Sequence, residues 1–239
     1  MTTVVISQPM LFPWVGMFEQ IALADVFVHY DDVQFSKGSF TNRVQVKTAQ
    51  GGSWLTVPLR KFHLGETIAN LRADDDRPWR AGHLRALDEA YRSAPYLSEM
   101  LELVRSVYAS DLPLPDLLMT SMERVARLVG ADRGTTFLRS SSLGTGGSGS
   151  DRVLRLVRDL GGSTYVTGHG ARNYLDASAF EAAGVEVRYM DYSCREYPQL
   201  HGPFTPHVTV LDLLANVGPD AAALLDPRTV DWRTFVARV

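Results

Sequence analysis

The stretch Val4–Lys47 reads VVISQPMLFPWVGMFEQIALADVFVHYDDVQFSKGSFTNRVQVK, and it decides the fold. It opens on a β-branched run, Val4 to Ile6, which stops at Gln8-Pro9 as a buried parallel strand stops where the chain enters a loop. Val26 to Tyr30 is a second β-rich run. Between the two runs, apolar residues recur three or four apart, the spacing of one helix face: Trp14, Met17, Phe18, Ile21 and Ala24. The stretch therefore predicts a β-loop-α-β unit with its helix over Trp14–Ala24.

Two carboxylates, Asp31 and Asp32, stand where the second strand gives way to a loop. The carboxyl ends of parallel strands are where open α/β sheets bind ligands, and burial there could raise the pKa of a carboxyl group. The pair could supply a general base or bind a cation. Alternatively, one carboxylate pairs with Arg43 or Lys37 and orders the loop. Because adjacent strand residues point to opposite faces, we expect at most one of the two to face a shared site.

Lys37, Asn42 and Arg43 follow in a loop rich in hydrogen-bond donors. They could hold a phosphate, sulfate or carboxylate, for which arginine offers a bidentate fork. A salt-bridged hairpin is the alternative interpretation. Two short strands flank the turn at Gln50-Gly51-Gly52 and predict that hairpin.

The rest of the chain alternates between helix and strand. From Trp79 to about Gly130 the apolar spacing is helical, and prolines divide it into three helices, which predicts a helical insertion whose apolar stripe is core or a partner surface. Strand and helix patterns then follow in turn at 135–139, 152–160, 164–167, 177–183, 185–189 and 210–216. This second alternation predicts one mostly parallel sheet built from both ends of the chain. The fold class is α/β, Rossmann-like and doubly wound, in a single domain over 1–239 with the insertion at about 79–130.

Three later features are candidates for function, each with a structural alternative. The Gly/Ser-rich run 140–150 has the composition of a mobile active-site loop, and Ser150-Asp151-Arg152 behind it is a helix cap or, through Arg152, an anion site. His169, between two glycines after a strand, is a general acid or base, or a surface histidine in a turn. Cys194 is a nucleophile, or an inert packing residue.

Composition excludes several classes of function. With 24 basic and 27 acidic residues the net charge is −3, so we expect neither nucleic acid nor a membrane surface as partner. The single cysteine excludes an internal disulfide, and His201 and His207 lack a recognised zinc spacing, so we expect no metal and no cofactor. No paired histidines of a nucleotidyl transferase and no G-x-G-x-x-G fingerprint follow the first strand. With no signal peptide or membrane span in the pattern, we expect a cytoplasmic protein.

A set of motifs spread over nearly the whole chain resembles the WbqC-like protein family: Gln8-Pro9, Phe12-Pro13-Trp14 with Gly16, Asp31 to Phe35, Lys37, Asn42-Arg43, Trp54 to Pro58, Asp151-Arg152, Tyr165 to Gly170, Tyr174-Leu175, Tyr197-Pro198-Gln199 and Asp212 to Leu214. The family is associated with bacterial glycan and secondary-metabolite gene clusters. The resemblance therefore implies a biosynthetic context.

We predict a cytoplasmic biosynthetic enzyme that modifies a polar small molecule, free or tethered to a carrier, by group transfer or intramolecular cyclisation. A carboxylate would deprotonate an amine or hydroxyl nucleophile while cationic side chains bind an anionic or leaving group. The alternative is a non-catalytic subunit that binds a carrier domain or a partner enzyme. The residues predicted to act are Asp31, Asp32 and His169 in catalysis, and Gln8, Trp14, Gln34, Lys37, Asn42, Arg43, Arg152 and Tyr174 in substrate binding.

Overall fold

The structure is a computed structural model that describes residues 1–238. Its centre is a six-stranded sheet in the order β5-β2-β1-β6-β7-β8. Neighbouring strands are parallel except for β7 and β8. The strands are β1 (Thr3–Ser7), β2 (Val26–His29), β5 (Thr136–Arg139), β6 (Thr164–Thr167), β7 (Glu186–Met190) and β8 (Thr229–Asp231). The prediction of one mostly parallel sheet drawn from both ends of the chain is confirmed.

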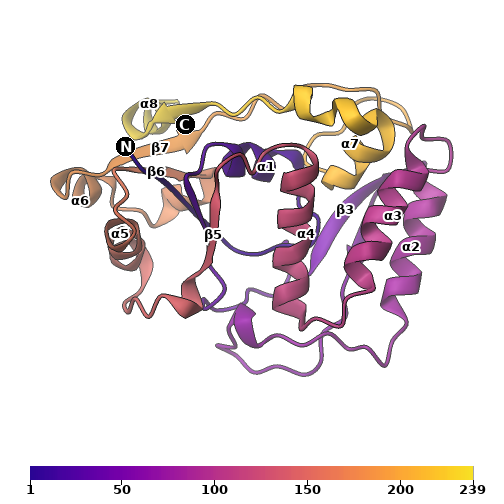
Figure 1. The fold of residues 1–239 in the computed structure, drawn as a ribbon, viewed down its shortest axis with the longest axis horizontal. Helices are drawn as coiled ribbons and strands as arrows, with labels where there is room; N and C mark the ends of the chain where they lie inside the picture. The colour runs from indigo at the N-terminus through magenta and orange to yellow at the C-terminus, as the bar shows by residue number, and fades with distance from the viewer. Residues whose placement is uncertain (239) are drawn as a thin grey trace.

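Helices cover both faces of this sheet, as a doubly wound fold requires (Figure 1). Successive residues of β1 alternate between the faces: Val5 joins one core cluster, while Val4 and Ile6 join the other. The cluster around Val5 takes in α1 (Val15–Ala22), α4 (Leu114–Leu128) and α7 (Val210–Val217), and the cluster around Val4 takes in α5 (Gly149–Asp159), α6 (Ala177–Ala182) and α8 (Trp232–Ala237). The predicted β-loop-α-β unit is present, with Trp14 as the residue before the helix.

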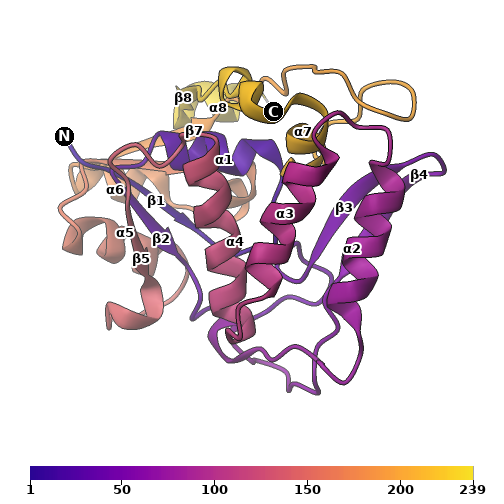
Figure 2. The same ribbon diagram turned by 45° about the vertical axis from the view of Figure 1, so that its right-hand side comes forward.

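The connection from β2 to β5 carries the hairpin and the helical insertion. After the hairpin of β3 (Arg43–Thr48) and β4 (Gly51–Thr56), a 3-10 turn η1 (Ile68–Asn70) leads into α2 (Trp79–Ala90), α3 (Leu97–Tyr108) and α4. Figure 2 shows α2 and α3 beside the hairpin and α4 beside α1, so the insertion packs on the same side as α1. Most of its apolar stripe is buried, for example Leu87, Val104 and Leu117, which makes the stripe core.

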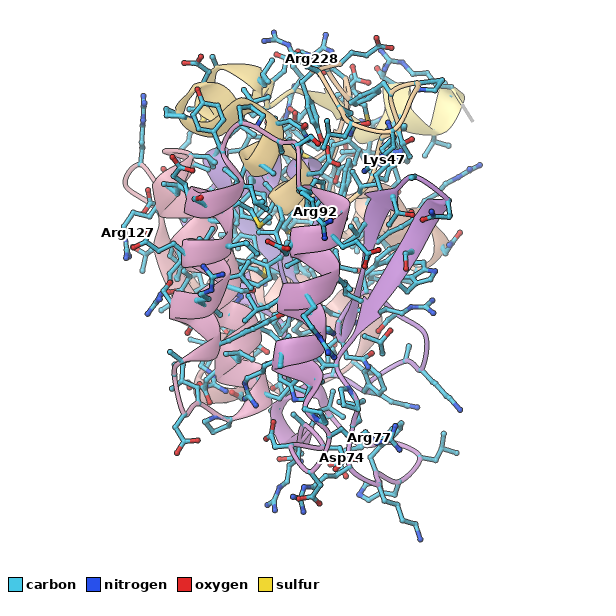
Figure 3. All side chains as sticks on the ribbon, turned by 90° about the vertical axis from the view of Figure 1, so that its right-hand side faces the viewer. Lys47, Asp74, Arg77, Arg92, Arg127 and Arg228 are labelled. Atoms are coloured by element: carbon cyan, nitrogen blue, oxygen red, sulfur yellow. The ribbon has the colours of Figure 1, made fainter. Side chains whose placement is uncertain are left out.

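A buried lysine ties the hairpin to the segment that follows β7. Lys47, at the end of β3 in Figure 3, is 4% exposed and donates hydrogen bonds to the side chain of Gln199 and to the carbonyls of Gly202 and Pro203. These acceptors satisfy the ammonium group that burial would otherwise destabilise. The segment 199–203 is therefore held against the hairpin.

Three predictions about loops and ends need correction. Residues 140–150 are not a uniformly open loop, because Ser140–Ser142 form a 3-10 turn, η2, and Ser140 is fully buried. Helix α5 begins at Gly149 after Ser148, so Ser150 and Asp151 lie inside its first turn and do not cap it. Strand β8, helix α8 and the 3-10 turns η3 (His169–Asn173) and η4 (Gly218–Leu224) were not predicted. Within residues 1–238, no helix is long and apolar enough to cross a membrane.

Candidate functional site

A cleft of about 980 Å³ opens at the carboxyl ends of β1 and β6. These two strands lie at the point where the strand order reverses, since the chain passes from β1 to β2 on one side and from β6 to β7 on the other. Loops diverge there, and open α/β sheets bind ligands in the resulting crevice. We call it the switch-point cleft; it is lined by Ile6, Ser7, Gln8, Met10, Trp14, Met17, Gln20, Tyr30, Val33, Phe40, Gly149, Val153, Thr167, Gly168, His169, Gly170, Ala171, Tyr174, Tyr192, Cys194 and His207.

The β1–α1 loop forms one wall and is held in a strained conformation. Phe12 has φ 43°, a left-handed backbone that a bulky residue rarely adopts. Its N–H donates to Ser121 Oγ of α4 at 3.1 Å, and its carbonyl accepts from Thr209 Oγ1 at 2.7 Å. Cys194 and His207, which also line the cleft, have positive φ as well. Strained residues held by their surroundings are typical of functional sites.

Trp14 lies at the middle of this wall, and Gly16 makes room for it. A Cβ atom at position 16 would lie 2.2 Å from Trp14 Cη2, so only glycine accommodates the ring in this place. The indole makes edge-to-face contacts with Tyr192 and His207, with ring centroids 4.6 and 4.7 Å apart. The spacing Trp14-Val15-Gly16 therefore positions one aromatic wall of the cleft.

His169 is the side chain in the cleft best suited to move a proton near neutral pH. Its Nε2 lies 2.9 Å from the carbonyl oxygen of Met190. A carbonyl only accepts, so Nε2 carries the hydrogen and Nδ1 of the neutral ring carries the lone pair. The ring also packs on Tyr192 and Phe235, with centroids 5.1 and 4.9 Å away. Backbone and aromatic contacts thus fix both the tautomer and the position of the ring.

Three phenols supply hydrogen-bond donors to the same cleft. Burial raises the pKa of Tyr30, Tyr174 and Tyr192, so all three hydroxyls stay protonated near neutral pH. The Tyr192 hydroxyl accepts from Gln20 Nε2 at 3.1 Å, which leaves its own proton available to a ligand. At Gly168 a Cβ atom would lie 3.0 Å from the same Gln20 nitrogen and 3.2 Å from the Tyr192 hydroxyl. Glycine allows the backbone to approach this pair closely.

The cleft contains no aspartate, glutamate, lysine or arginine among its lining residues in the described chain. Burial raises the pKa of the Cys194 thiol, and the nearby Glu19 carboxylate adds to the effect, so this thiol is not an activated nucleophile. The imidazoles among the lining residues of the described chain are those of His169 and His207.

Asp31 lies outside the cleft, in a separate network at the ends of β2 and β5. It is fully buried and accepts hydrogen bonds from Arg139 Nε and Nη2, each at 3.1 Å, and from the backbone and hydroxyl of Ser141 at 3.0 and 2.8 Å. Burial by itself would raise the pKa of Asp31, but the hydrogen bonds from Ser141 and from Arg139, with the charge of Arg139, outweigh it and lower the pKa. The carboxylate is ionised and has no face turned to a substrate.

Asp32 belongs to the same network and connects it to the cleft. One of its oxygens accepts from Ser140 Oγ at 2.6 Å, and the other pairs with Arg152, whose side chain is 10% exposed. The Arg152 guanidinium lies 5.1 Å from the centre of the Tyr30 ring, so it supports a cleft residue without lining the cleft. The alternative in which one carboxylate pairs with Arg43 or Lys37 is wrong, because Asp31 pairs with Arg139 and Asp32 with Arg152. Both carboxylates contact Ser140, although we expected them to point to opposite faces.

Four predicted binding residues of the β2–β3 region also lie away from the cleft. Gln34 is exposed and its backbone forms an isolated antiparallel β-bridge with Thr67, and Lys37 is exposed. Asn42 is buried and donates to the carbonyl of Val57 at 2.9 Å. Arg43 donates to the carbonyl of Gly38 and lies 4.3 Å over the ring of Trp54. From the same connection, Tyr30, Val33 and Phe40 do line the cleft.

The structure therefore brings four of the predicted residues together, Gln8, Trp14, His169 and Tyr174. Gln20, Tyr30 and Tyr192 also line the cleft and were not predicted. Gln20 offered one signal, since it is a polar residue beside the apolar face of the first helix. Within residues 1–238, no three histidine, cysteine or carboxylate side chains converge as metal ligands do.

Comparisons with known proteins agree with the sequence motifs. The sequence model of the WbqC-like protein family matches residues 8–224. The chain is also 33% identical over 229 residues to the uncharacterized protein Rv1507c of Mycobacterium tuberculosis (strain ATCC 25618 / H37Rv), which covers 92% of this chain and 96% of that protein. No solved structure matches the chain. The span matched by the family includes every cleft residue from Gln8 to His207.

Proposed function

The chain belongs to the WbqC-like protein family, and we propose that it is a biosynthetic enzyme that binds a small molecule in the switch-point cleft and catalyses group transfer or ring closure. The observation that carries this proposal is the contact between His169 Nε2 and the Met190 carbonyl, which in a neutral ring assigns the hydrogen to Nε2. Its Nε2–H is committed to the Met190 carbonyl at 2.9 Å, which leaves Nδ1 to accept a proton, and among residues 1–238 the cleft is lined by no aspartate, glutamate, lysine or arginine.

In the proposed reaction, His169 Nδ1 takes the proton from an amine or hydroxyl nucleophile as that nucleophile forms a bond to an electrophilic carbon. The phenols of Tyr30, Tyr174 and Tyr192 donate hydrogen bonds to the oxygen on which negative charge develops. The imidazolium then returns its proton to the leaving group as the old bond breaks. The Met190 carbonyl stabilises the charged ring in between. Nucleophile and electrophile on one molecule give cyclisation, and on two molecules they give transfer.

The cleft also limits which part of the substrate can enter. A fully charged group would lose water there without meeting a counter-charge, which is unfavourable. Met10, Trp14, Met17 and Phe40 offer apolar surface, and Gln8 and the phenols offer hydrogen bonds. We therefore expect the reacting portion of the substrate to be neutral and partly apolar, which revises the expectation that cations near Lys37 and Arg43 bind it.

Asp31, Asp32 and Arg152 become positioning residues in this proposal. Asp32 holds Arg152, and Arg152 lies over the ring of Tyr30, so the network fixes one phenol of the cleft. The charged groups of Asp31, Asp32 and Arg152 are paired within this network and do not line the cleft.

The test is to incubate the protein with an extract of small metabolites and follow consumed and formed masses by mass spectrometry. We compare wild type with His169→Gln, for which general-base catalysis predicts a rate loss of about 10²- to 10⁴-fold. The matched control is His201→Gln. His201 Nε2 also lies within hydrogen-bond distance of a backbone carbonyl, Ala90 O at 2.7 Å, but the residue does not line the cleft.

The proposal holds if the same masses change with wild type and His201→Gln and not with His169→Gln, while all three proteins melt at similar temperatures. It fails if His169→Gln turns over at the wild-type rate. It also fails if the wild-type protein changes no mass in extracts of its native host.

A further inference from the structure

A second cleft, of about 950 Å³, lies between the connection from β4 to α2 and the turn from α3 into α4. Figures 1 and 2 show this connection running below the adjoining ends of α3 and α4, and Figure 3 marks it by Asp74 and Arg77. We call it the basic cleft. It shares no lining residue with the switch-point cleft. Nothing in the proposed reaction uses it.

Cationic side chains outnumber acidic ones around the basic cleft, in a chain whose net charge is −3. The cations are Arg60, Lys61, Arg72 and Arg80, and the acids are Glu66, Asp75 and Asp111. Two of the acids are already engaged, since Asp75 accepts from Arg80 and Glu66 pairs with His63 at 3.0 Å. Within residues 1–238, Lys61 and Arg72 have no ion-pair partner, and Arg60 has only an exposed contact of 3.6 Å with Asp76. Such an exposed pair contributes little, so three cations remain available to a ligand.

Arg80 adds a donor that lacks an acceptor. Its Nη1 pairs with Asp75 and its guanidinium lies 4.4 Å over the Trp79 ring. The Nε atom is buried and makes no hydrogen bond within the described chain. A buried donor on a charged group is costly to leave without an acceptor. Because Nε is out of reach of solvent, Arg80 offers a ligand only the part of its side chain that is exposed, 30%.

The floor of the same cleft is apolar. Leu71, Leu114 and Leu117 are buried there, and Phe62 and Leu112 stand at the surface with 38% of each exposed. A simple inorganic anion would use the cations and leave the exposed parts of Phe62 and Leu112 in contact with water. A phosphate ester on an apolar or aromatic body would use both, because arginine and lysine bind phosphate oxygens while the body covers Phe62 and Leu112.

We propose that the basic cleft binds an organic phosphate through Arg60, Lys61 and Arg72, with the organic part packed on Phe62 and Leu112. The phosphate could belong to a nucleotide or to a phosphopantetheine chain, and both present the same chemistry to the three cations. This site is a binding site separate from the proposed catalytic cleft, so its occupancy can be measured without knowing the substrate.

The test is calorimetric titration with phenyl phosphate, with inorganic phosphate and phenol as the two halves of the probe. We expect phenyl phosphate to bind more tightly than inorganic phosphate, phenol to bind least, and the affinity for phenyl phosphate to fall as salt is added. The double variant Lys61→Gln with Arg72→Gln should lower the affinity for phenyl phosphate by about 10- to 100-fold, since two charge-assisted contacts are lost. Both side chains are exposed, so the double variant should melt like wild type.

The matched control is Arg92→Gln with Arg127→Gln, which removes the same charge from exposed positions outside both clefts (Figure 3). It should keep the wild-type affinity. Titrations with AMP and with 4′-phosphopantetheine identify the source, since the ligand whose affinity falls most in the Lys61 and Arg72 variant is the one the cleft fits. An unchanged affinity for phenyl phosphate in that variant, or phenol binding as tightly as phenyl phosphate, overturns the proposal.

Discussion

Two regions at the same edge of one sheet use their polar side chains in opposite ways. At the ends of β2 and β5, the charged groups of Asp31, Asp32, Arg139 and Arg152 are paired with one another and with neighbouring serines. At the ends of β1 and β6, the polar groups are neutral and open into a cleft. The charged groups hold loops together, and the uncharged donors and acceptors line an open cleft.

Strand order explains the difference. Strands β2 and β5 are parallel neighbours, so the residues after them, Asp31 and Ser140, meet directly and satisfy each other. The loops after β1 and β6 lead to opposite sides of the sheet, so they separate and leave the crevice. A dense cluster of charged residues in a sequence can therefore be satisfied by its own neighbours in the fold.

The largest effect on stability is expected from Asp31→Asn. The substitution places an amide group among donors from Arg139 and Ser141 and removes the charge that a fully buried network depends on, which should cost about 3 kcal/mol of unfolding free energy. Asp116→Asn is the control, because Asp116 pairs with the same arginine at 2.6 Å but is one-third exposed, and its loss should cost less than about 1 kcal/mol. If urea unfolding shows the same loss of unfolding free energy for Asp31→Asn and Asp116→Asn, the region is not organised around Asp31.

A smaller effect is expected on the cleft side, from Gly16→Ala. The new methyl group would displace the Trp14 ring, and such overpacking costs about 1–3 kcal/mol. Gly82→Ala in α2 is the control, since nothing lies within 4 Å of the added atom and alanine should stabilise the helix by about 0.5–1 kcal/mol. Urea unfolding should show a lower free energy of unfolding for Gly16→Ala and a higher one for Gly82→Ala. Tryptophan fluorescence reports the movement of the Trp14 ring. Stabilisation by both variants would mean that Trp14 is not held by contact with Gly16.

The third expected difference is one of pH dependence. Because the folded-state pKa of Asp31 is lowered from its ordinary 3.8, the ionised carboxylate adds stability that is fully present above that pH and is lost as the pH falls through the folded-state pKa. Asp31→Asn lacks this contribution, so the gap in stability between wild type and variant should narrow in acid below about pH 3.8. Unfolding free energies measured from pH 7 down to pH 3 test it. A gap that stays constant or widens would contradict an ionised, network-bound Asp31.

Much of the fold followed from local pattern. The β-branched runs at Val4 and Val26, the helical spacing of Trp14–Ala24 and the proline-divided helices of 79–130 were all confirmed. Strand β8 and helix α8 were missed because Thr229–Asp231 is a short edge strand without alternation, and α8 has only six residues, Trp232–Ala237. Periodicity needs more length than these elements offer.

The candidate site was only half predictable. Gln8, Trp14, His169 and Tyr174 stand next to strand ends or in motifs, and they meet in the cleft. Arg139 and Ser140 carried no signal that they would meet Asp31, since 108 residues separate Arg139 from it along the chain. Tyr192 and Gln20 likewise approach from distant segments, 172 residues apart.

The sequence by itself determined which segments become strand or helix, because period and proline placement act over a few residues. It also determined that a strand would end at Asp31 and Asp32. Only the tertiary structure decided that these acids are saturated by hydrogen bonds and that His169 Nε2 meets the Met190 carbonyl. The reason is physical: whether a polar atom is available depends on which distant groups the packed sheet brings within hydrogen-bond distance of it, and no local pattern encodes that distance.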